Sequence, residues 1–368
     1  MRDVAERAQQ EVVRLAHQGL DLFTFLECAQ EQFRRVTAFE GAACFFTIDP
    51  ATHLLTGHIN DDLAHDDERR RAVNLGVANN EYNEEDYNKF AELARSAGKA
   101  GVLADATGGR PEHSARYREL IRPFGLDGEL RAAFVADDAC WGSVALFRTP
   151  DQPSFEEGDR DFFHRISRDM AEGMRTALVL RAIDGVDGPD SPGLILLDDD
   201  GMVEAVNPMA SHWLGQLVDP GQPTGEVLPE VVYAVAERAR RAAAGDPDHG
   251  PVHARVPSRA GRWLILHGTR LQGRRRGAAV IIEPARAPDI TPLLLEAYGL
   301  SGREQAVTLC VLQGLSTAEI AERLFISPYT VQDHLKEVFE KVGVRSRKAL
   351  VARIFFEQYF SRMQDPPG

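Results

Sequence analysis

The side chains whose types could do chemistry gather on a predicted helix, Pro328–Lys341, near the C-terminal end of the sequence. An amide on this helix can pair with adenine, a carboxylate can accept from cytosine N4, and an ammonium can reach guanine or phosphate. Because the N-terminal residues of such a helix approach base edges most closely, the pattern predicts contact with double-stranded DNA in the major groove. The polar face consists of Tyr329, Thr330, Gln332, Asp333, Lys336 and Glu337.

Further polar residues around this helix suit contacts with phosphate, which position a protein on DNA without specifying sequence. From Lys341 to Arg353 the chain carries five cations and no acidic residue. This local basic character favours DNA binding even though the whole chain has a net charge of −14. The alternative, a solvated polar face on a protein-binding helical bundle, is disfavoured by the basic stretch. The additional DNA-contact candidates are Thr317, Lys341, Arg345 and Arg347, with Thr330 of the helix also suited to phosphate.

Serine residues begin each of the four helices predicted here, because a serine hydroxyl accepts from the free backbone N–H groups of a first turn. The first two serines are each followed three residues later by glutamate, which completes a capping box. Glycines follow the first and third helices, where a left-handed residue commonly ends a helix. The serines are Ser301, Ser316, Ser327 and Ser346, and the glycines are Gly314 and Gly343.

A three-residue turn, 325–327, joins the second and third of these helices and predicts a helix-turn-helix. Apolar residues recur on one face of each helix, so we interpret them as core and not as contacts. They are Ile320, Ala321, Leu324, Val331, Leu335, Val338 and Val342, with Ile326 in the corner.

On these residues the segment resembles the C-terminal helix-turn-helix of LuxR-type regulators, the GerE-like fold. The resemblance implies an all-α four-helix domain with Pro328–Lys341 as its recognition helix, and dimerisation through the last helix. The matching positions are Leu300, Ser301, Arg303, Glu304, Gly314, Leu315, Ser316, Glu319, Ile320, Ala321, Leu324, Ser327, Pro328, Thr330, Val331, His334, Leu335, Lys341 and Arg347. The implied dimer face is Leu350, Val351, Ile354 and Phe355.

Asp333 departs from the family pattern, since many members carry a basic or small residue at this position. A carboxylate there would repel phosphate, so we expect Asp333 to face a base edge or to be paired locally.

Two segments rich in Gly, Pro and Asp, Ile183–Gly193 and Glu283–Pro292, predict interdomain linkers. They divide the chain into 1–183, 191–285 and 292–368. We therefore expect a multidomain protein with two α+β domains before the helix-turn-helix.

The first segment shows helical patterns, short strands and a hairpin of Leu130–Ala136 with Cys140–Phe147, followed by a helix over 155–182. It resembles a GAF sensor domain with a long exit helix. That helix carries an apolar stripe at heptad-like spacing, which leaves two interpretations open: dimerisation, or packing on its own sheet. The stripe is Phe163, Ile166, Met170, Gly173, Ala177 and Leu180.

The second segment begins with strand Leu194–Leu197, a hairpin turn at Asp198–Gly201 and return strand Met202–Val206. Asn207 with Pro208 predicts a helix start. Two closing strands are joined by a basic loop, Gly273–Gly277. The segment resembles a PAS domain.

Several function classes find no support in the sequence. No apolar run approaches the ~20 residues of a membrane-spanning helix, and the N-terminus lacks the apolar core of a signal peptide, so we expect a cytoplasmic protein. The four cysteines are far apart and predict buried free thiols. The histidines of the first segment show no ligand spacing, and no nucleophile with a base or Gly-rich phosphate loop is present. We therefore predict no enzyme, no cofactor and no metal site.

The favoured hypothesis is a sequence-specific, homodimeric transcription regulator controlled by a small molecule or a partner that the GAF-like or PAS-like region senses. The alternative is a constitutive DNA binder whose upstream domains only dimerise. The partners expected under the favoured hypothesis are double-stranded DNA, a second copy of the chain, a small-molecule ligand and RNA polymerase.

Overall fold

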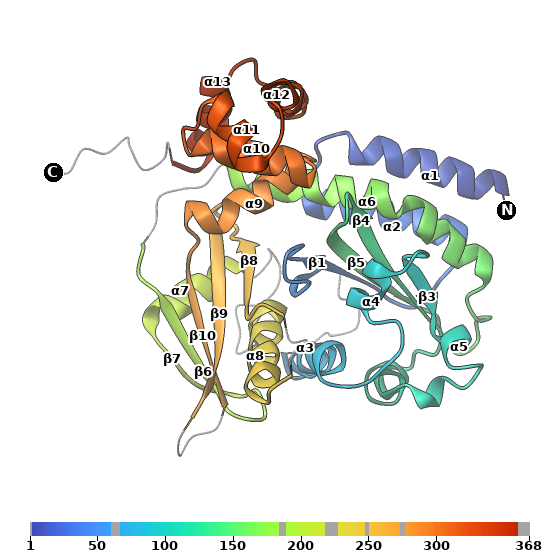
Figure 1. The fold of residues 1–368 in the computed structure, drawn as a ribbon. Coiled ribbons are helices and arrows are strands. Elements are labelled where there is room, and N and C mark those ends of the chain that lie inside the picture. Colours follow the sequence, from blue (N-terminus) through green and yellow to red (C-terminus); the bar gives the residue numbers. More distant parts are fainter. Residues whose placement is uncertain are drawn as a thin grey trace.

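The computed structural model describes residues 2–59, 67–183, 189–217, 227–246, 250–272 and 277–359. In these ranges the chain forms two antiparallel five-stranded sheets, each with its own helices, and a C-terminal group of helices (Figure 1). Among the helices described, none is long and apolar enough to cross a membrane.

The first unit, 2–183, contains a sheet in the strand order β2-β1-β5-β4-β3. Helices α1, α2 and α6 pack together on one side of this sheet. The elements are α1 (Arg2–Ala16), α2 (Leu22–Thr37), β1 (Ala43–Ile48), β2 (Leu55–Ile59), α3 (Asp67–Tyr82), α4 (Phe90–Arg95), β3 (Ala100–Val102), α5 (Leu103–Ala106), short helical turns at Pro111–His113, Tyr117–Ile121 and Arg122–Phe124, β4 (Glu129–Ala136), β5 (Ala139–Phe147) and α6 (Glu157–Ile183).

The predicted hairpin of the first unit is confirmed as β4 and β5, with Leu130 opposite Leu146. Its turn residues, Asp137 and Asp138, both have left-handed backbones, with φ of 51° and 66°. Positive φ at both central residues matches a type I′ turn, whose twist suits the flanking strands.

The apolar stripe of α6 packs inside its own unit. Phe163, Ile166, Met170 and Ala177 are all buried in the core that α6 shares with α1, α2 and the sheet. At Gly173 an added Cβ would lie 2.2 Å from the ring of Phe25 on α2, so only glycine permits this close helix approach. Of the two open interpretations, packing within the chain therefore accounts for the described stripe; the side chain of Leu180 lies outside the described residues.

The second unit, 189–284, contains a sheet in the order β7-β6-β10-β9-β8, with α7 and α8 packed on it. Its elements are β6 (Gly193–Leu197), β7 (Val203–Val206), α7 (Pro208–Leu217), α8 (Glu230–Ala243), β8 (His253–Pro257), β9 (Trp263–Leu271) and β10 (Gly277–Pro284).

Local signals in the second unit are confirmed. The carboxylate of Asp198 accepts from the N–H of Met202 at 2.7 Å and closes the predicted turn, in which Gly201 has φ 77°. The side chain of Asn207 caps α7 by accepting from the N–H of Ala210 at 2.8 Å. The predicted basic loop lies mostly outside the described residues, as does much of the first predicted linker.

The segment predicted as a linker, Glu283–Pro292, consists mostly of regular secondary structure. Strand β10 continues to Pro284, and α9 (Ala287–Ala297) follows after two residues. Pro288 lies at the second helical position, where a missing N–H costs nothing, and Asp289 caps the helix by accepting from the N–H of Arg286 at 2.9 Å. Pro288 is therefore tolerated in the first turn of a helix that connects the second unit to the C-terminal helices, while Pro292 lies further inside that helix.

An ion pair buried between the two sheets joins both units to α9. Arg255 on β8 donates to Asp49, which follows β1, from Nη2 at 2.6 Å and from Nε at 3.0 Å. Its Nη1 donates to the carbonyl oxygen of Asp289 on α9 at 3.0 Å. The side chains of Arg255 and Asp49 are 5% and 0% exposed, so their charges depend on each other and not on water.

Asp49→Asn should reduce the stability of the intact protein strongly, because it leaves the buried guanidinium of Arg255 without a counter-charge. Breaking such a pair costs about 3–5 kcal/mol, which corresponds to a fall in Tm of roughly 6 °C or more. Thermal unfolding of the purified variant measures this change.

Asp199→Asn is the matched control, since Asp199 pairs with Arg270 at 3.2 Å on the surface, where both side chains are about one-third to one-half exposed. Exposed pairs contribute about 0–1 kcal/mol, so its Tm should stay close to that of the unaltered protein. Equal Tm changes in the two variants would contradict the structural role of Arg255.

Candidate DNA-binding face and interior pocket

The C-terminal helices begin and end at the predicted residues. They are α10 (Gly302–Leu312), α11 (Thr317–Leu324), α12 (Pro328–Val342) and α13 (Arg347–Tyr359). Both predicted capping boxes form: Glu304 accepts from the N–H of Ser301, and Glu319 from the N–H of Ser316, each at 2.7 Å. Ser327 accepts from the N–H of Thr330 at 3.0 Å, and α12 ends at Gly343 with φ 73°.

The predicted core of this domain is confirmed, and its packing orients α12. Ile320 and Ala321 of α11 are buried with the apolar face of α12, while Leu324 and Ile326 pack against them partly exposed. Because one face of α12 is committed to the core, its opposite face must point outward. The buried residues of α12 are Val331, Leu335, Val338 and Val342.

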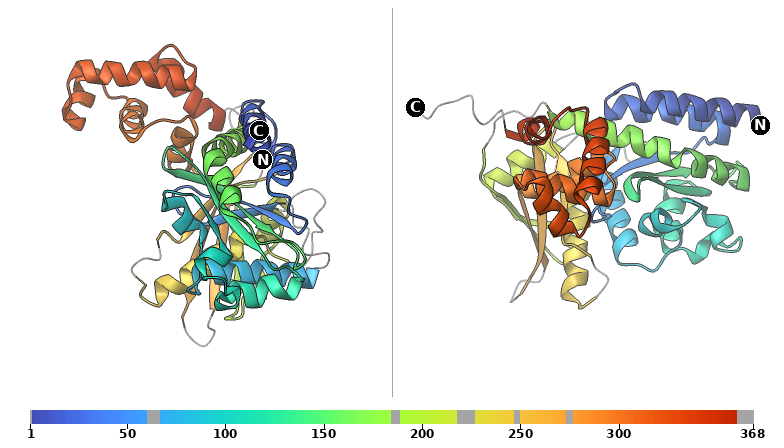
Figure 2. Two further views of the ribbon diagram at one scale, coloured as in Figure 1. Left: turned by 90° about the vertical axis from the view of Figure 1, so that its right-hand side faces the viewer. Right: turned by 45° about the horizontal axis from the view of Figure 1, so that its top comes forward.

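The outward face of α12 carries the predicted base-reading residues. Gln332, Asp333 and Lys336 are exposed, and Tyr329 is 75% exposed. Asp333 forms no ion pair with any described residue, which leaves its carboxylate open to a base edge. The views in Figure 2 show the C-terminal helices standing off from the two sheets, so this domain is accessible to a large partner.

Four of the predicted DNA contacts lie around one shallow hollow between α11, α12 and the start of α13. Its rim is Thr317, Gln332, Lys336 and Arg347, and its floor is Leu335 and Phe339. Arg347 holds the rim together, since it donates to the carbonyl oxygen of Leu315 at 2.9 Å and to Thr317 Oγ1 at 2.8 Å. The side chain of Arg347 therefore positions Thr317 as well as supplying positive charge.

Lys341 is less free than its sequence position indicates. Its ammonium donates to both carboxylate oxygens of Glu304, at 2.7 and 3.0 Å, and so joins α12 to the start of α10. Burial opposes the charged form of Glu304, but hydrogen bonds from Lys341 and Ser301 outweigh it and lower the pKa of this carboxyl. A phosphate contact by Lys341 would have to share this ion pair and remains a prediction, whereas Arg345 is exposed beyond the end of α12.

Phe325, in the turn before α12, was not among the predicted contact residues. Its side chain is 94% exposed, and its backbone is left-handed with φ 54°. An aromatic side chain rarely adopts this conformation, and water is a poor environment for it. An exposed aromatic side chain therefore stands just before α12, and only its residue type indicated this in advance.

The predicted dimer residues divide into two groups. Leu350 and Ile354 are buried in the core of their own domain, at 0% and 2% exposed. Val351 is partly exposed, and the side chain of Phe355 lies outside the described residues. The last helix therefore offers less free apolar surface than the resemblance implied, and dimerisation through it remains a prediction.

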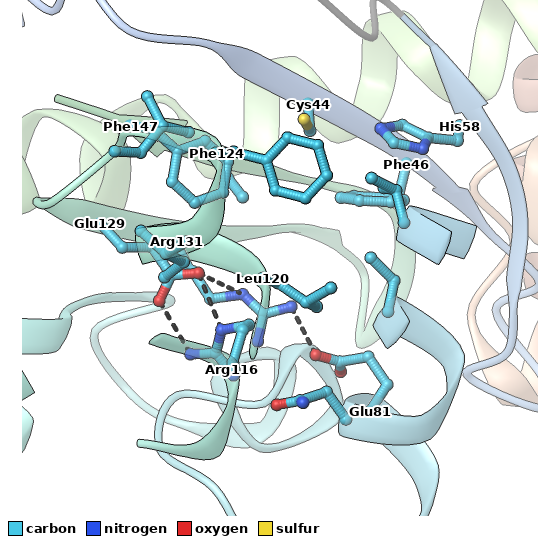
Figure 3. A pocket seen from close by; sticks show the side chains of 16 residues that line it. Cys44, Phe46, His58, Glu81, Arg116, Leu120, Phe124, Glu129, Arg131 and Phe147 are labelled. Carbon is cyan, nitrogen blue, oxygen red and sulfur yellow. Dashed lines mark hydrogen bonds and ion pairs between the residues drawn. The ribbon is translucent and has the colours of Figure 1, made fainter. Parts of the chain in front are cut away.

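A second candidate site is a pocket inside the first unit, between α3, the short turns at 117–124 and one face of the sheet (Figure 3). The enclosed cavity is small, about 40 Å³, and the space rises to about 540 Å³ only when gaps between side chains and the solvent at its mouth are included. Figure 3 shows Phe46, Phe124 and Phe147 at one end and a network of charged side chains at the other. Apolar walls with a few polar groups are typical of small-molecule sites.

The four cysteines are free thiols, and three of them are buried. Cys44, Cys140 and Cys310 are buried free thiols, while Cys28 is half-buried. Burial raises the pKa of the Cys140 thiol to about 12, which keeps it protonated and unreactive. Within the described ranges, no three His, Cys, Asp or Glu side chains come together in a way that could hold a metal ion.

Comparison with known proteins identifies the family that the C-terminal domain resembles. Residues 299–354 match the family of bacterial regulatory proteins, luxR family. The spore germination protein GerE of Bacillus subtilis is 38% identical over 55 residues, which cover 15% of this chain and 74% of that protein. A putative HTH-type transcriptional regulator of Mycobacterium bovis is 35% identical over 120 residues, 32% of this chain; the chain thus matches only 12% of that relative's length.

Solved structures give only distant likenesses. The bacteriophytochrome RpBphP3 of R. palustris has 12% identity and a TM-score of 0.33, covering 79% of this chain and 74% of its own. A complex of phage VqmA with DPO has 18% identity and a TM-score of 0.24, covering 46% and 83%. Because these TM-scores are low, the two sheet units are interpreted from their own residues.

The capped helices, the three-residue turn and the family match agree on the same stretch of chain. Residues 299–354 are therefore a LuxR-type helix-turn-helix domain.

Proposed function

We propose that this chain is a sequence-specific DNA-binding transcription regulator whose α12 enters the major groove. The observation that carries the proposal is the division of α12 into a buried apolar face and an exposed face bearing Gln332, Asp333 and Lys336. Side chains of these three types can distinguish base pairs by hydrogen bonding. Thr317, Arg345 and Arg347 would hold the phosphates on either side.

We further propose that the protein binds as a homodimer, with two recognition helices about one DNA turn, ~34 Å, apart on an inverted repeat. A monomeric helix-turn-helix of this size makes few base contacts, and pairing two of them multiplies sequence discrimination.

The GAF-like first unit and the PAS-like second unit would control this binding by sensing a small molecule or a partner. What supports control is the position of α9: Leu294 packs in the core shared with the first unit, and Leu295 packs in the core of the helix-turn-helix domain. A change in either core therefore acts on the same helix. A constitutive binder whose upstream units only dimerise is the alternative, and it would show no ligand-dependent stabilisation.

Genome-wide DNA affinity sequencing with the intact protein tests the proposal. We expect an inverted repeat to be recovered and to be lost in a Gln332→Ala, Lys336→Ala double variant. Arg168→Ala is the control, because it removes a cation from the surface of α6, where Arg168 pairs with Glu172 at 2.9 Å. Absence of enrichment by the intact protein, or enrichment unchanged by the double variant, would overturn the proposal.

Gln332→Ala and Arg345→Ala should weaken DNA binding in different ways. Loss of a base contact at Gln332 should reduce affinity for the recovered site by about 1–3 kcal/mol and leave binding to an unrelated duplex unchanged. Loss of a phosphate contact at Arg345 should weaken both duplexes equally and reduce the slope of log affinity against log salt by about 0.9. Fluorescence anisotropy over a range of salt concentrations measures both effects, and an identical pattern for the two variants would refute the assignment of roles.

A further inference from the structure

Among the described residues that line the interior pocket of the first unit, Asn80 has both of its polar side-chain atoms without a hydrogen-bond partner. Asn80, on α3, lines the pocket and is 1% exposed. Neither its Oδ1 nor its Nδ2 has a hydrogen-bond partner in the described part of the chain. Since native structures pair the great majority of buried polar atoms, an amide left open at a cavity wall indicates a missing partner.

The charged side chains of the pocket, by contrast, pair with one another. Arg116 donates to both oxygens of Glu129, at 2.9 and 2.8 Å, and Arg131 donates to Glu81. Arg116 Nη1 and Arg131 Nε have no acceptor at hydrogen-bond distance, but each lies near a carboxylate, 3.8 Å from Asp86 and 3.9 Å from Glu129. Two guanidinium groups and two carboxylates line the pocket, so a charged ligand would find no spare counter-charge.

The remaining wall is mostly apolar and aromatic, with the imidazole of His58 stacked on the ring of Phe46 at 4.5 Å between ring centroids. Phe46, Phe124 and Phe147 lie at the end of the pocket away from the charged network (Figure 3), and Val73 and Val77 of α3 also line the cavity. A flat apolar body would bury well against such a wall.

We propose that this pocket binds a compact, neutral, largely apolar molecule that presents an amide-type edge, one donor beside one acceptor, to the carboxamide of Asn80. The proposal rests on the ligand-controlled function proposed above and gives the chemical class of the signal. A carboxamide offers the complementary pair of groups, so a ligand of this class satisfies both open atoms of Asn80 at once.

Helix α3 also connects the pocket to the second unit. Asn74 donates to the carbonyl oxygen of Leu228 at 3.2 Å, and Asn83, just after α3, donates to Glu237 on α8 at 2.6 Å. A ligand held by Asn80 therefore contacts the helix that forms the interface with the second unit, so occupancy can bias the arrangement of the two units.

Thermal unfolding of the intact protein without DNA tests the proposal, with benzamide, benzoate and toluene as probes. The three share a phenyl ring and differ in carrying an amide, a carboxylate or no polar edge. Benzamide at saturation should raise Tm by about 2 °C or more. The other two probes should raise it less at the same concentration.

Asn80→Leu should abolish the benzamide shift and should itself unfold at an equal or higher temperature, because it replaces an unpaired buried amide with hydrocarbon of similar size. Asn74→Leu is the matched control on the same helix: it loses a hydrogen bond, so its Tm should fall while the benzamide shift persists. Val77→Phe fills the pocket and should abolish the shift even where Asn80→Leu fails to fold.

Equal shifts in Tm by the three probes would contradict the proposal that the ligand is recognised by an amide edge. No shift with benzamide, or a shift that survives in Asn80→Leu or Val77→Phe, would overturn the site. These results are separate from the DNA experiment, since a missing operator would refute the regulator and leave the benzamide measurements standing.

Discussion

A guanidinium buried between two sheets must be matched by oxygens, and Arg255 meets this requirement by joining three parts of the chain. Its partners are the carboxylate of Asp49 from the first unit and the carbonyl oxygen of Asp289 at the start of α9. Because a buried charge tolerates little displacement from its counter-charge, the two sheets and α9 hold a defined arrangement. Burial at this junction also raises the pKa of the Glu296 carboxyl, further along α9.

From this junction, packing extends in two directions. Along α9 it reaches the helix-turn-helix domain, since neighbouring residues Leu294 and Leu295 belong to the core of the first unit and the core of the C-terminal domain. Across the sheets it reaches α8 and then α3, which forms a wall of the interior pocket. The pocket and the recognition helix are therefore linked by contiguous packed elements, which is the physical requirement for one to influence the other.

Features with local causes could be predicted from the sequence. Capping boxes, the Asp137–Asp138 turn, the Asn207 cap and the buried face of α12 each depend on residues within a few positions of one another. Helix α9 was missed because its prolines suggested a break, although Pro288 lies in its first turn, where proline is tolerated, and the helix continues past Pro292.

Pairs that are distant in sequence could not be predicted in the same way. Asp49 and Arg255 are 206 residues apart, and Glu304 and Lys341 are 37 apart, so nothing in their neighbourhoods indicates the pairing. The unpaired amide of Asn80 could not be predicted either, because its lack of hydrogen-bond partners depends on residues that are distant in the sequence. Leu350 and Ile354 are a further example. An apolar stripe predicts that they are buried, but it does not predict whether they pack against the same chain or a second copy.

The most direct test of the central claim is dimethyl sulfate protection of a bound operator by the intact protein. Dimethyl sulfate methylates guanine N7, which is exposed in the major groove. If α12 reads DNA from that groove, guanines in two half-sites about one helical turn apart should be protected at saturating protein. Full occupancy of the operator with unchanged reactivity at every guanine N7 would contradict the account.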